Sequence, residues 1–590
     1  MFAAVLDLKG RPLDRPTLAG AGLIVEGPPD TPELAFVRSV EHFDGEWRGT
    51  AHLQERYWIA GRIRLDARHA LAARLADRFP PDTIPGAISP TDGDLCLQAY
   101  ATWRDRCVDH LAGDFAFVLW DGRERRLRAI RDQLGVRTLF HAESGGALIV
   151  GDSLDWIAAR QPDRALDEQW IADFLTAGFS LDAERTVYRT VRRLAPAHSL
   201  DHSRGATTVR RYWSLQVGDP LHLRNTRAYA ERFLELASAA IRDRLPAGKV
   251  GISMSGGIDS TTLAACTVAA AGDAGRVVAE CTCYERLMPD DEASFASLAA
   301  RQLGIDLRTR AVDDLIYDPA WRGRSDGGAE PTAGVIAFHP EQIMASEQAA
   351  QSPVWFFGEG PDNALVFERG AYLSWLVRRR DWGRLGEAMF RYLKAKRGRG
   401  WRETLRRYAG RNDSAPAEPD TACWLDRSLA ERLGQEARLA RLAASDPLAH
   451  PWHPRAVASF ASPVWTAMFD GFDRDERLAP MVWRHPYLDL RVLAFLLSVP
   501  PVPWAREKLL MREAMRGRLP DAVLARPKTP LAGTPLAHAI APYGLPPLSA
   551  GARLGHYVDL QALPQQLPSG SALDRLIAVH ALDHWLAAHT

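Results

Sequence analysis

Cysteine is scarce in this chain. Only six cysteines occur among 590 residues, and their spacing does not resemble a disulfide framework. Cys281 and Cys283 are one residue apart, but no second pair follows to complete a zinc site. A disulfide-stapled secreted domain and a zinc-finger protein are therefore excluded. We expect buried free thiols in a reducing compartment, and hence a cytoplasmic protein.

The chain also lacks net charge and long apolar runs. Lysine plus arginine and aspartate plus glutamate both total 73, so no bulk attraction to nucleic acid or to a membrane surface is expected. Residues 1–7 do not resemble the start of a signal peptide, and no apolar run approaches the ~20 residues of a membrane span. The charge is uneven, because residues 378–411 are crowded with arginine and lysine. A solvated helical face is the ordinary explanation, and a dock for an acidic partner is the alternative.

The length predicts two domains or three, and the composition is that of a globular protein. The first domain, residues 1–210, reads as short strands punctuated by Gly, Pro and Asp, with helical patterns at residues 67–78 and 95–107. This predicts layered β-sheets with helices, ending near Arg204 and Gly205. The expected strands are residues 23–25, 35–40, 57–65, 115–120, 127–130 and 147–150.

Strands alternate with helices from residue 225 onward. Tyr229, Phe233 and Leu236 recur at helical spacing, and apolar runs at residues 250–254, 277–284, 305–312 and 353–357 read as buried strands. Such alternation predicts a parallel, doubly wound sheet. Beyond Gly370 the pattern is mainly helical. The second domain, residues 211–590, is therefore expected to be α/β with helical additions.

The strongest chemical signal is a loop of small residues that ends the strand at 250–254 and begins a helix. Its glycines let backbone amides approach an anion, and the helix N-terminus adds favourable partial charge. Serine hydroxyls add donors, and the aspartate can hold magnesium. The ending of a Walker A loop is absent. A tight turn is the structural alternative to a phosphate site made by Ser255, Gly256, Gly257, Asp259 and Ser260.

A second glycine-rich loop, Gly358-Glu359-Gly360-Pro361-Asp362-Asn363, follows the strand at 353–357. Alone it is equally well explained as a turn. Together the two loops resemble the paired signatures of the asparagine-synthetase family, which cleaves ATP to AMP and pyrophosphate. The resemblance implies that Gly358 lines the nucleotide site, that Asp362 joins Asp259 on Mg²⁺, and that Glu359 takes part in amide formation. This chain has Asn363 where the family usually has a glutamate.

The resemblance covers nearly the whole chain. It implies an α+β first domain of the class II glutamine amidotransferase type and a second domain of the adenine nucleotide alpha-hydrolase type. The glutaminase nucleophile of such a first domain is an N-terminal cysteine, whereas position 2 here is Phe2 and the nearest cysteine is Cys96. Without a thiolate this route to ammonia is closed, so the amine is expected to come from the substrate. The amidotransferase-like stretches are residues 113–117, 120–121, 131–135 and 193–196.

Relatives with a silent first domain include β-lactam synthetases, carbapenam synthetases and lasso peptide cyclases, and the C-terminal third looks most like the cyclases. This implies an enzyme that uses ATP and Mg²⁺ to adenylate an Asp or Glu side chain of a leader-free precursor peptide. The N-terminal amine of the peptide then closes a macrolactam. A leader-binding protein and a leader peptidase are the implied partners. The stretches that carry the likeness are residues 453–455, 484–491, 503–504, 508–512 and 526–529.

Two lysines compete for a place near the chemistry. Lys528 follows Arg526 and Pro527 in a stretch whose lysine, in relatives, touches the reacting carboxylate and phosphate, where a cation stabilises developing negative charge. Read without the resemblance, it is an exposed lysine in a turn. Lys508 lies on an expected helix at residues 506–517, where a surface salt bridge is its ordinary role.

Several bulky residues are open to two interpretations. Trp452, Trp465, Trp483 and Trp504 line a substrate cavity between the domains or, more ordinarily, belong to the core. His485, before a proline, is expected to be a structural hydrogen-bonding residue rather than a base.

Two other functions remain open. A β-lactam-synthetase-like enzyme would close an amide within a small molecule, and a neighbouring gene for a short precursor peptide would argue against it. A non-catalytic scaffold would bind nucleotide or peptide without turnover, and a pyrophosphate-exchange assay separates it from an enzyme.

Overall fold

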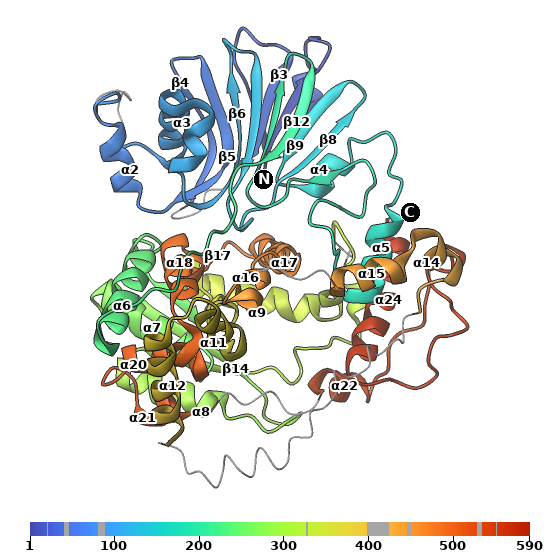
Figure 1. Cartoon of the computed structure of the whole chain (residues 1–590). Coiled ribbons are helices and arrows are strands. Elements are labelled where there is room, and N and C mark those ends of the chain that lie inside the picture. Colours follow the sequence, from blue (N-terminus) through green and yellow to red (C-terminus); the bar gives the residue numbers. More distant parts are fainter. Residues whose placement is uncertain are drawn as a thin grey trace.

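The computed structural model describes residues 1–20, 22–40, 46–80, 89–325, 328–397, 424–444, 450–527, 534–549 and 551–589. Two stacked sheets form the N-terminal half, and a helix-rich half lies beneath them in Figure 1. Within these ranges, every helix is too short or too polar to cross a bilayer.

Two antiparallel sheets build the first domain, with six strands each among the described residues. One has the order β10 (Arg192–Arg193), β8 (Phe140–Ser144), β9 (Ala147–Gly151), β1 (Phe2–Asp7), β3 (Leu34–Ser39) and β2 (Leu23–Glu26). The other has the order β12 (Ala206–Arg211), β11 (His198–Ser203), β7 (Arg126–Arg131), β6 (Gly113–Asp121), β5 (Tyr57–Leu65) and β4 (Trp47–Leu53).

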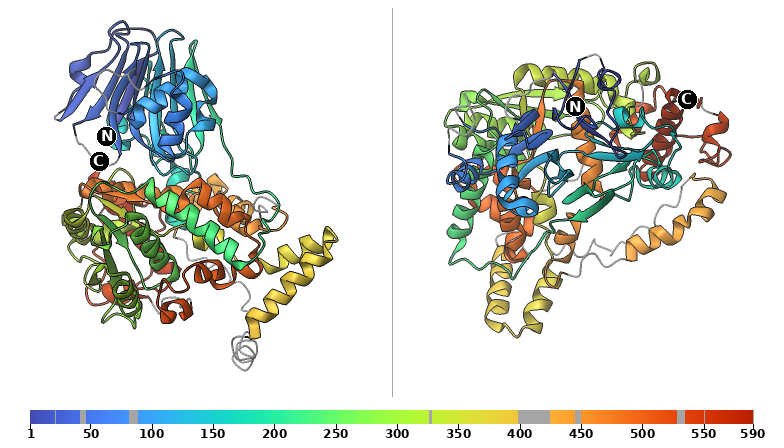
Figure 2. Two further views of the ribbon diagram at one scale, coloured as in Figure 1. Left: turned by 90° about the vertical axis from the view of Figure 1, so that its left-hand side faces the viewer. Right: turned by 90° about the horizontal axis from the view of Figure 1, so that it is seen from above.

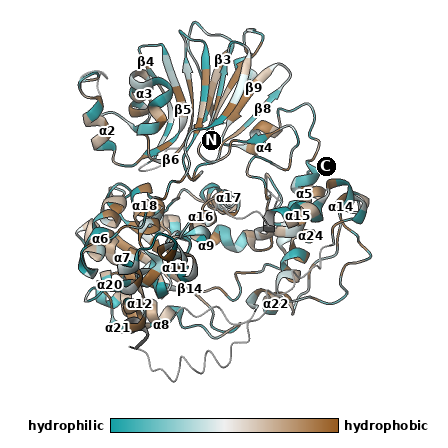
Figure 3. Cartoon of the chain, in the orientation of Figure 1, coloured by the Kyte–Doolittle hydropathy of each residue, from teal (hydrophilic) through white to brown (hydrophobic). Residues whose placement is uncertain are grey.

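Apolar side chains fill the space between these sheets. Phe2 and Phe36 from one sheet meet Val118 and Trp120 from the other. Helix α3 (Asp92–Trp103) covers the outer face of the second sheet, and α4 (Leu154–Ala158) with α5 (Glu168–Ala177) covers the outer face of the first. Brown and teal alternate along the strands in Figure 3, as expected for strands with differing faces. The predicted layered α+β domain is confirmed.

Six of these strands were absent from the sequence prediction, namely β1, β4, β8, β10, β11 and β12. Arg204 and Gly205 form the hairpin turn between β11 and β12, with Gly205 at a φ of 77°. Both residues therefore lie inside the first domain, whose second sheet continues to Arg211, beside the predicted boundary at residue 210.

A parallel sheet forms the centre of the second half, in the order β15 (Asp306–Ala311), β14 (Val277–Cys283), β13 (Val250–Ser253), β16 (Val354–Phe356) and β17 (Val482–Arg484). One face packs against α6 (Thr226–Arg242), α7 (Ile258–Ala271), α8 (Glu292–Leu303), α18 (Leu490–Ser498) and α20 (Leu509–Ala514). The other packs against α9 (Phe338–Gln351) and α17 (Val464–Leu478). The predicted α/β domain is confirmed, with β17 as an additional strand.

The strand order reverses between β13 and β16. Strands β14 and β15 extend the sheet on one side of β13, whereas β16 and β17 extend it on the other. In open parallel sheets, ligands bind beyond the carboxyl ends of the strands at such a switch point. Both glycine-rich loops follow these two strands.

The two halves share a core and buried ion pairs. The C-terminal helix α24 (Ser571–Ala588) packs on α5 of the first domain, as Figure 1 shows. Arg62 on β5 lies 2.6 Å from Asp473 on α17 and also pairs with Glu476. All three are almost fully buried. The first domain is therefore fastened to the second through charges that water does not reach.

Candidate active site

The structure brings the two predicted loops into contact. Strands β13 and β16 are parallel neighbours, with Ile252 paired to Phe356. A Cβ atom added to Gly358 would lie 3.7 Å from the backbone nitrogen of Ser260, at van der Waals contact. The predicted residues of this site that the structure describes are Ser255, Gly256, Gly257, Asp259, Ser260, Gly358, Glu359 and Asp362.

Hydroxyl and amide groups are gathered in the first loop. The Ser255 and Ser260 hydroxyls lie 3.0 Å apart, and the Ser260 hydroxyl also donates to the Ser255 carbonyl at 2.8 Å. Helix α7 begins after Gly257 and has no side-chain cap. Since the first amides of a helix have no partner within the helix, this terminus offers N–H donors to an anion.

Gly256 cannot carry a side chain. An added Cβ would lie 2.5 Å from the Phe295 Cβ and 2.6 Å from an Arg526 guanidinium nitrogen. The Gly256 amide donates to Glu292 at 2.6 Å, and Arg526 holds the same carboxylate at 2.9 Å. Arg526 thus anchors the predicted lysine-bearing stretch to the first loop. Lys528 itself lies outside the described residues, so its role stays a prediction.

Lys508 connects the two loops. Its ammonium nitrogen contacts Asp259 and lies 2.6 Å from Asp362. The Lys508 side chain is only 11% exposed, and its backbone φ of 55° is unusual for a residue with a side chain. The expectation of an ordinary surface salt bridge is therefore wrong. Lys508 does form ion pairs, but its partners are Asp259 and Asp362, the two carboxylates that were predicted to bind Mg²⁺.

The same geometry tests whether the site suits a metal ion. One ammonium group reaches both carboxylates, so oxygens of Asp259 and Asp362 lie close enough to share a single cation. Carboxylate oxygens are the ligands that Mg²⁺ prefers. The Asp362 side chain is 48% exposed, which leaves it accessible. The residues present therefore fit Mg²⁺.

Composition contains a signal that points to Lys508. The chain has only six lysines, whereas arginine supplies the rest of its positive charge. A compact ammonium and a planar guanidinium are not interchangeable, so a lysine retained in an arginine-rich chain suggests a need for a point charge. The six are Lys9, Lys249, Lys394, Lys396, Lys508 and Lys528.

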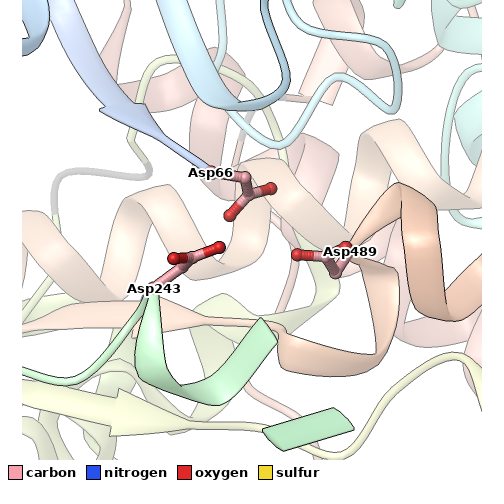
Figure 4. Close-up of side chains that lie close together, drawn as sticks. All are labelled: Asp66, Asp243 and Asp489. Atoms are coloured by element: carbon pink, nitrogen blue, oxygen red, sulfur yellow. The ribbon is translucent and has the colours of Figure 1, made fainter. Parts of the chain in front are cut away.

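A second group of carboxylates lies between the domains. Oxygens of Asp66, Asp243 and Asp489 lie within 4.8 Å of one another, and Figure 4 shows their side chains converging. Arg244 lies 2.8 Å from both Asp66 and Asp489, and Arg491 lies 2.6 Å from Asp243. These guanidinium groups offset the negative charge. The cluster is therefore an ion-pair network between the domains rather than a metal centre.

The described part of the first domain presents no thiolate. Phe2 is 1% exposed within the core, and its backbone amide donates to Asp152 at 2.7 Å. Cys96 and Cys107 are buried, and burial raises the pKa of the Cys107 thiol to about 12. At neutral pH this sulfur is a thiol, not a nucleophilic thiolate.

The remaining candidates are core residues. His485 packs against Phe469 and Phe472, and burial lowers the pKa of its imidazole to about 3. Its Nδ1 atom makes no hydrogen bond in the part of the chain that the structure describes, so aromatic contacts, more than hydrogen bonds, define its place. The core interpretation of the tryptophans is confirmed, since all four are at most 7% exposed: Trp452, Trp465, Trp483 and Trp504.

Comparison with known proteins identifies two domain types. Residues 86–213 match a glutamine amidotransferase domain, and residues 232–549 match asparagine synthase. The chain is 23% identical over 456 residues to asparagine synthetase [glutamine-hydrolyzing] 3 of Bacillus subtilis, covering 75% of this chain and 70% of that protein. It is 25% identical over 246 residues to amidase chyE of Penicillium rubens, covering 38% of this chain and 35% of that protein.

Similarity to solved structures is weak. Glutamine phosphoribosylpyrophosphate amidotransferase from B. subtilis, complexed with ADP and GMP, aligns with 52% of this chain and 59% of its own. The identity is 12% and the TM-score 0.23, values at which the alignment carries no argument.

Proposed function

This chain belongs to the asparagine synthase family, whose members form carbon–nitrogen bonds at the expense of ATP, and we propose that it is a lasso peptide cyclase. One observation carries the proposal. Two glycine-rich loops meet beyond β13 and β16, and the described residues of the first domain offer no thiolate. Since ammonia from glutamine is then unavailable, the nucleophilic amine comes from the substrate, and a peptide supplies one at its N-terminus.

In the first step a peptide carboxylate is activated. The triphosphate of ATP lies against the amides that begin α7 and the hydroxyls of Ser255 and Ser260. An Asp or Glu side chain of the peptide attacks the α-phosphorus. A carboxyl oxygen–phosphorus bond forms, the bond from the α-phosphorus to pyrophosphate breaks, and an acyl-adenylate results.

The side chains of Asp259, Asp362 and Lys508 meet at the two loops, where the negative charge of the triphosphate is proposed to be offset. Asp259 and Asp362 would hold Mg²⁺, which offsets the negative charge of the triphosphate. With the metal bound, the Lys508 ammonium would be released from these carboxylates and would offset negative charge on the phosphates. Lys528 is proposed to lie beside the reacting carboxylate and phosphate.

In the second step the ring closes. The N-terminal amine of the peptide attacks the acyl carbon, a carbon–nitrogen bond forms, and the bond to AMP breaks. Glu359 is proposed to take part here by accepting the proton that the amine releases. Holding amine and acyl group in one folded peptide provides an effective concentration on the order of 10⁵ M or more.

The test uses the full chain with ATP, Mg²⁺ and a leader-free precursor peptide. A product lighter by one water, formed together with AMP and pyrophosphate, supports the proposal. Release of ADP, or a product formed without ATP, contradicts it. Amide closure only on a small amino acid derivative would assign the chain to the β-lactam-synthetase-like alternative.

A leader-binding protein and a leader peptidase are proposed as partners that deliver the peptide. The basic stretch is described as far as residue 397, where α11 (Arg369–Arg378) and α12 (Trp382–Arg397) lie side by side and project from the body in Figure 2. We propose this projection as their dock. Glutamate in place of Arg378, Arg379 and Arg380 should weaken partner-dependent turnover, and unchanged turnover would remove the dock from the proposal.

A further inference from the structure

A cavity of about 400 Å³ lies between the two halves and is separate from the nucleotide loops, none of whose residues line it. Helix α17 forms one wall through Thr466, Ala467 and Asp470. The other walls come from both halves of the chain and include five aromatic side chains. The volume is in the size range of small-ligand sites. The aromatic residues are Phe140, Trp170, Phe174, Phe179 and Phe338.

Two carboxylates that line this cavity share one arginine as their partner. Arg193 on β10 lies 2.8 Å from both Glu330 and Asp470 through the same guanidinium nitrogen. The Arg193 side chain is 3% exposed, whereas those of Glu330 and Asp470 are 16% and 28% exposed. The acids thus lie on the accessible side and the arginine behind them. Two negative charges against one positive charge leave the wall acidic.

Other charged residues along the cavity do not reverse this balance. Arg474 is paired with Glu341 at 2.7 Å, and Arg477 lies 3.9 Å from Asp473. Asp155 is exposed at the rim and adds a further carboxylate. The lining as a whole carries five carboxylates, with Asp182 and Asp473 among them, against three guanidinium groups.

The pKa of Glu330 also favours a cationic ligand over an anionic one. Burial raises the pKa of Glu330 in spite of the neighbouring Arg193. A cation entering the cavity would stabilise the ionised carboxylate, while an anion would meet an acidic wall. Aromatic faces also attract cations.

We propose that this cavity is a binding site for an apolar or aromatic amine in its ammonium form. Glu330 and Asp470 would hold the ammonium group, and the aromatic walls would hold the apolar body. A free small amine and the amine-bearing end of a peptide share this chemistry. If the proposed function holds, the second source applies, and the cavity takes a cationic, apolar segment of the peptide substrate.

Gly471 on α17 provides a way to fill the cavity. It lines the cavity, and a Cβ atom added there would meet no atom within 4 Å. Gly471→Phe should therefore occupy ligand space without displacing the backbone. Gly386 on α12 is a matched control, because its added Cβ is also in open space and it lies outside the cavity.

The binding test uses L-phenylalaninamide, which carries an ammonium and an aromatic ring, and neutral N-acetyl-L-phenylalaninamide. Calorimetry should show the cationic compound binding about tenfold or more tightly than the neutral one. Gly471→Phe should abolish binding, Glu330→Gln should weaken it about tenfold, and Gly386→Phe should match the wild type. Equal binding of both compounds, or wild-type binding by Gly471→Phe, would overturn the proposal.

A turnover assay distinguishes the two sources of the amine. With a leader-free precursor peptide, Gly471→Phe should raise KM for the peptide about tenfold and leave KM for ATP unchanged. An unchanged peptide KM, with phenylalaninamide binding lost, assigns the cavity to a free amine. A wild-type protein that releases no AMP contradicts the proposed function, while the calorimetric result on the amine site still stands.

Discussion

Strand β1 of the first domain buries all six of its residues, whereas β13 and β16 of the second end in loops with exposed polar groups. The described part of the first domain buries Phe2 and its cysteines, whereas the loops of the second leave Ser255 and Asp362 exposed. At Phe2 a ring packs between two sheets, while at the carboxyl ends of the parallel strands an ammonium lies between two carboxylates. The packing that holds the first domain together is therefore separate from the polar groups that converge in the second.

The first domain is also joined to the second by buried charged groups. Its buried ion pairs with Asp473 on α17 and with Arg244, two residues beyond α6, join it to the second half. Several of these side chains are buried, so removing one member of a pair leaves the charge of the other buried and without its counter-charge. The comparison thus predicts different consequences for substitutions in the two regions.

The largest effect is expected at the two carboxylates. Asp259→Ala and Asp362→Ala should each lower pyrophosphate exchange by about 10³-fold or more, because negative charge on the triphosphate would lose its counter-ion. Asp219→Ala is the control, since Asp219 is exposed and pairs with the exposed Arg379. Near-normal exchange by either variant would remove that carboxylate from the nucleotide site.

The next largest effect is expected for Lys508→Ala. This variant should lower pyrophosphate exchange by about 10²-fold, because a cation near the phosphates is lost. A second measurement separates this role from a structural one. Without nucleotide, the variant should bind Mn²⁺ more tightly than the wild type by electron paramagnetic resonance, because the ammonium no longer competes for Asp259 and Asp362. Lys249→Ala, at an exposed lysine, should change neither quantity. Unaltered Mn²⁺ binding by Lys508→Ala would contradict competition at this position.

Asp473→Ala tests the domain interface. The substitution would remove one of the carboxylates that neutralise the buried Arg62 guanidinium. The free energy of unfolding, measured by denaturant titration, should therefore fall by about 3–5 kcal/mol. Asp219→Ala, which breaks an exposed pair, should lose at most about 1 kcal/mol. Equal losses in the two variants would show that the interface charges are not effectively buried.

The smallest chemical effect is expected at the start of the chain. Phe2→Cys should release no glutamate from glutamine, because position 2 faces the core between the sheets rather than an open pocket. Phe2→Leu is the matched control for lost packing. Glutamate release by the cysteine variant alone would show that the first domain keeps a working glutamine site.

The sequence predicted the elements whose signals are local. The strand, loop and helix around Gly256 were recognised because glycine, serine and aspartate follow a short apolar run. Strand β17 was missed because its three residues, Val482–Arg484, include a buried arginine. Strands β11 and β12 were missed because their polar residues resemble a loop, and pairing along the sheet edge, not hydrophobicity, makes them strands.

What the sequence by itself determined is the pair of loops and the absence of a cysteine at position 2. Both are read directly from residue types along a short stretch of chain. Only the tertiary structure decided that Lys508 lies between Asp259 and Asp362, since 249 residues separate the lysine from the first aspartate. It also decided that Glu330 and Asp470 share Arg193 beside a cavity between the domains. Such contacts depend on how helices pack against sheets, and no local pattern records that packing.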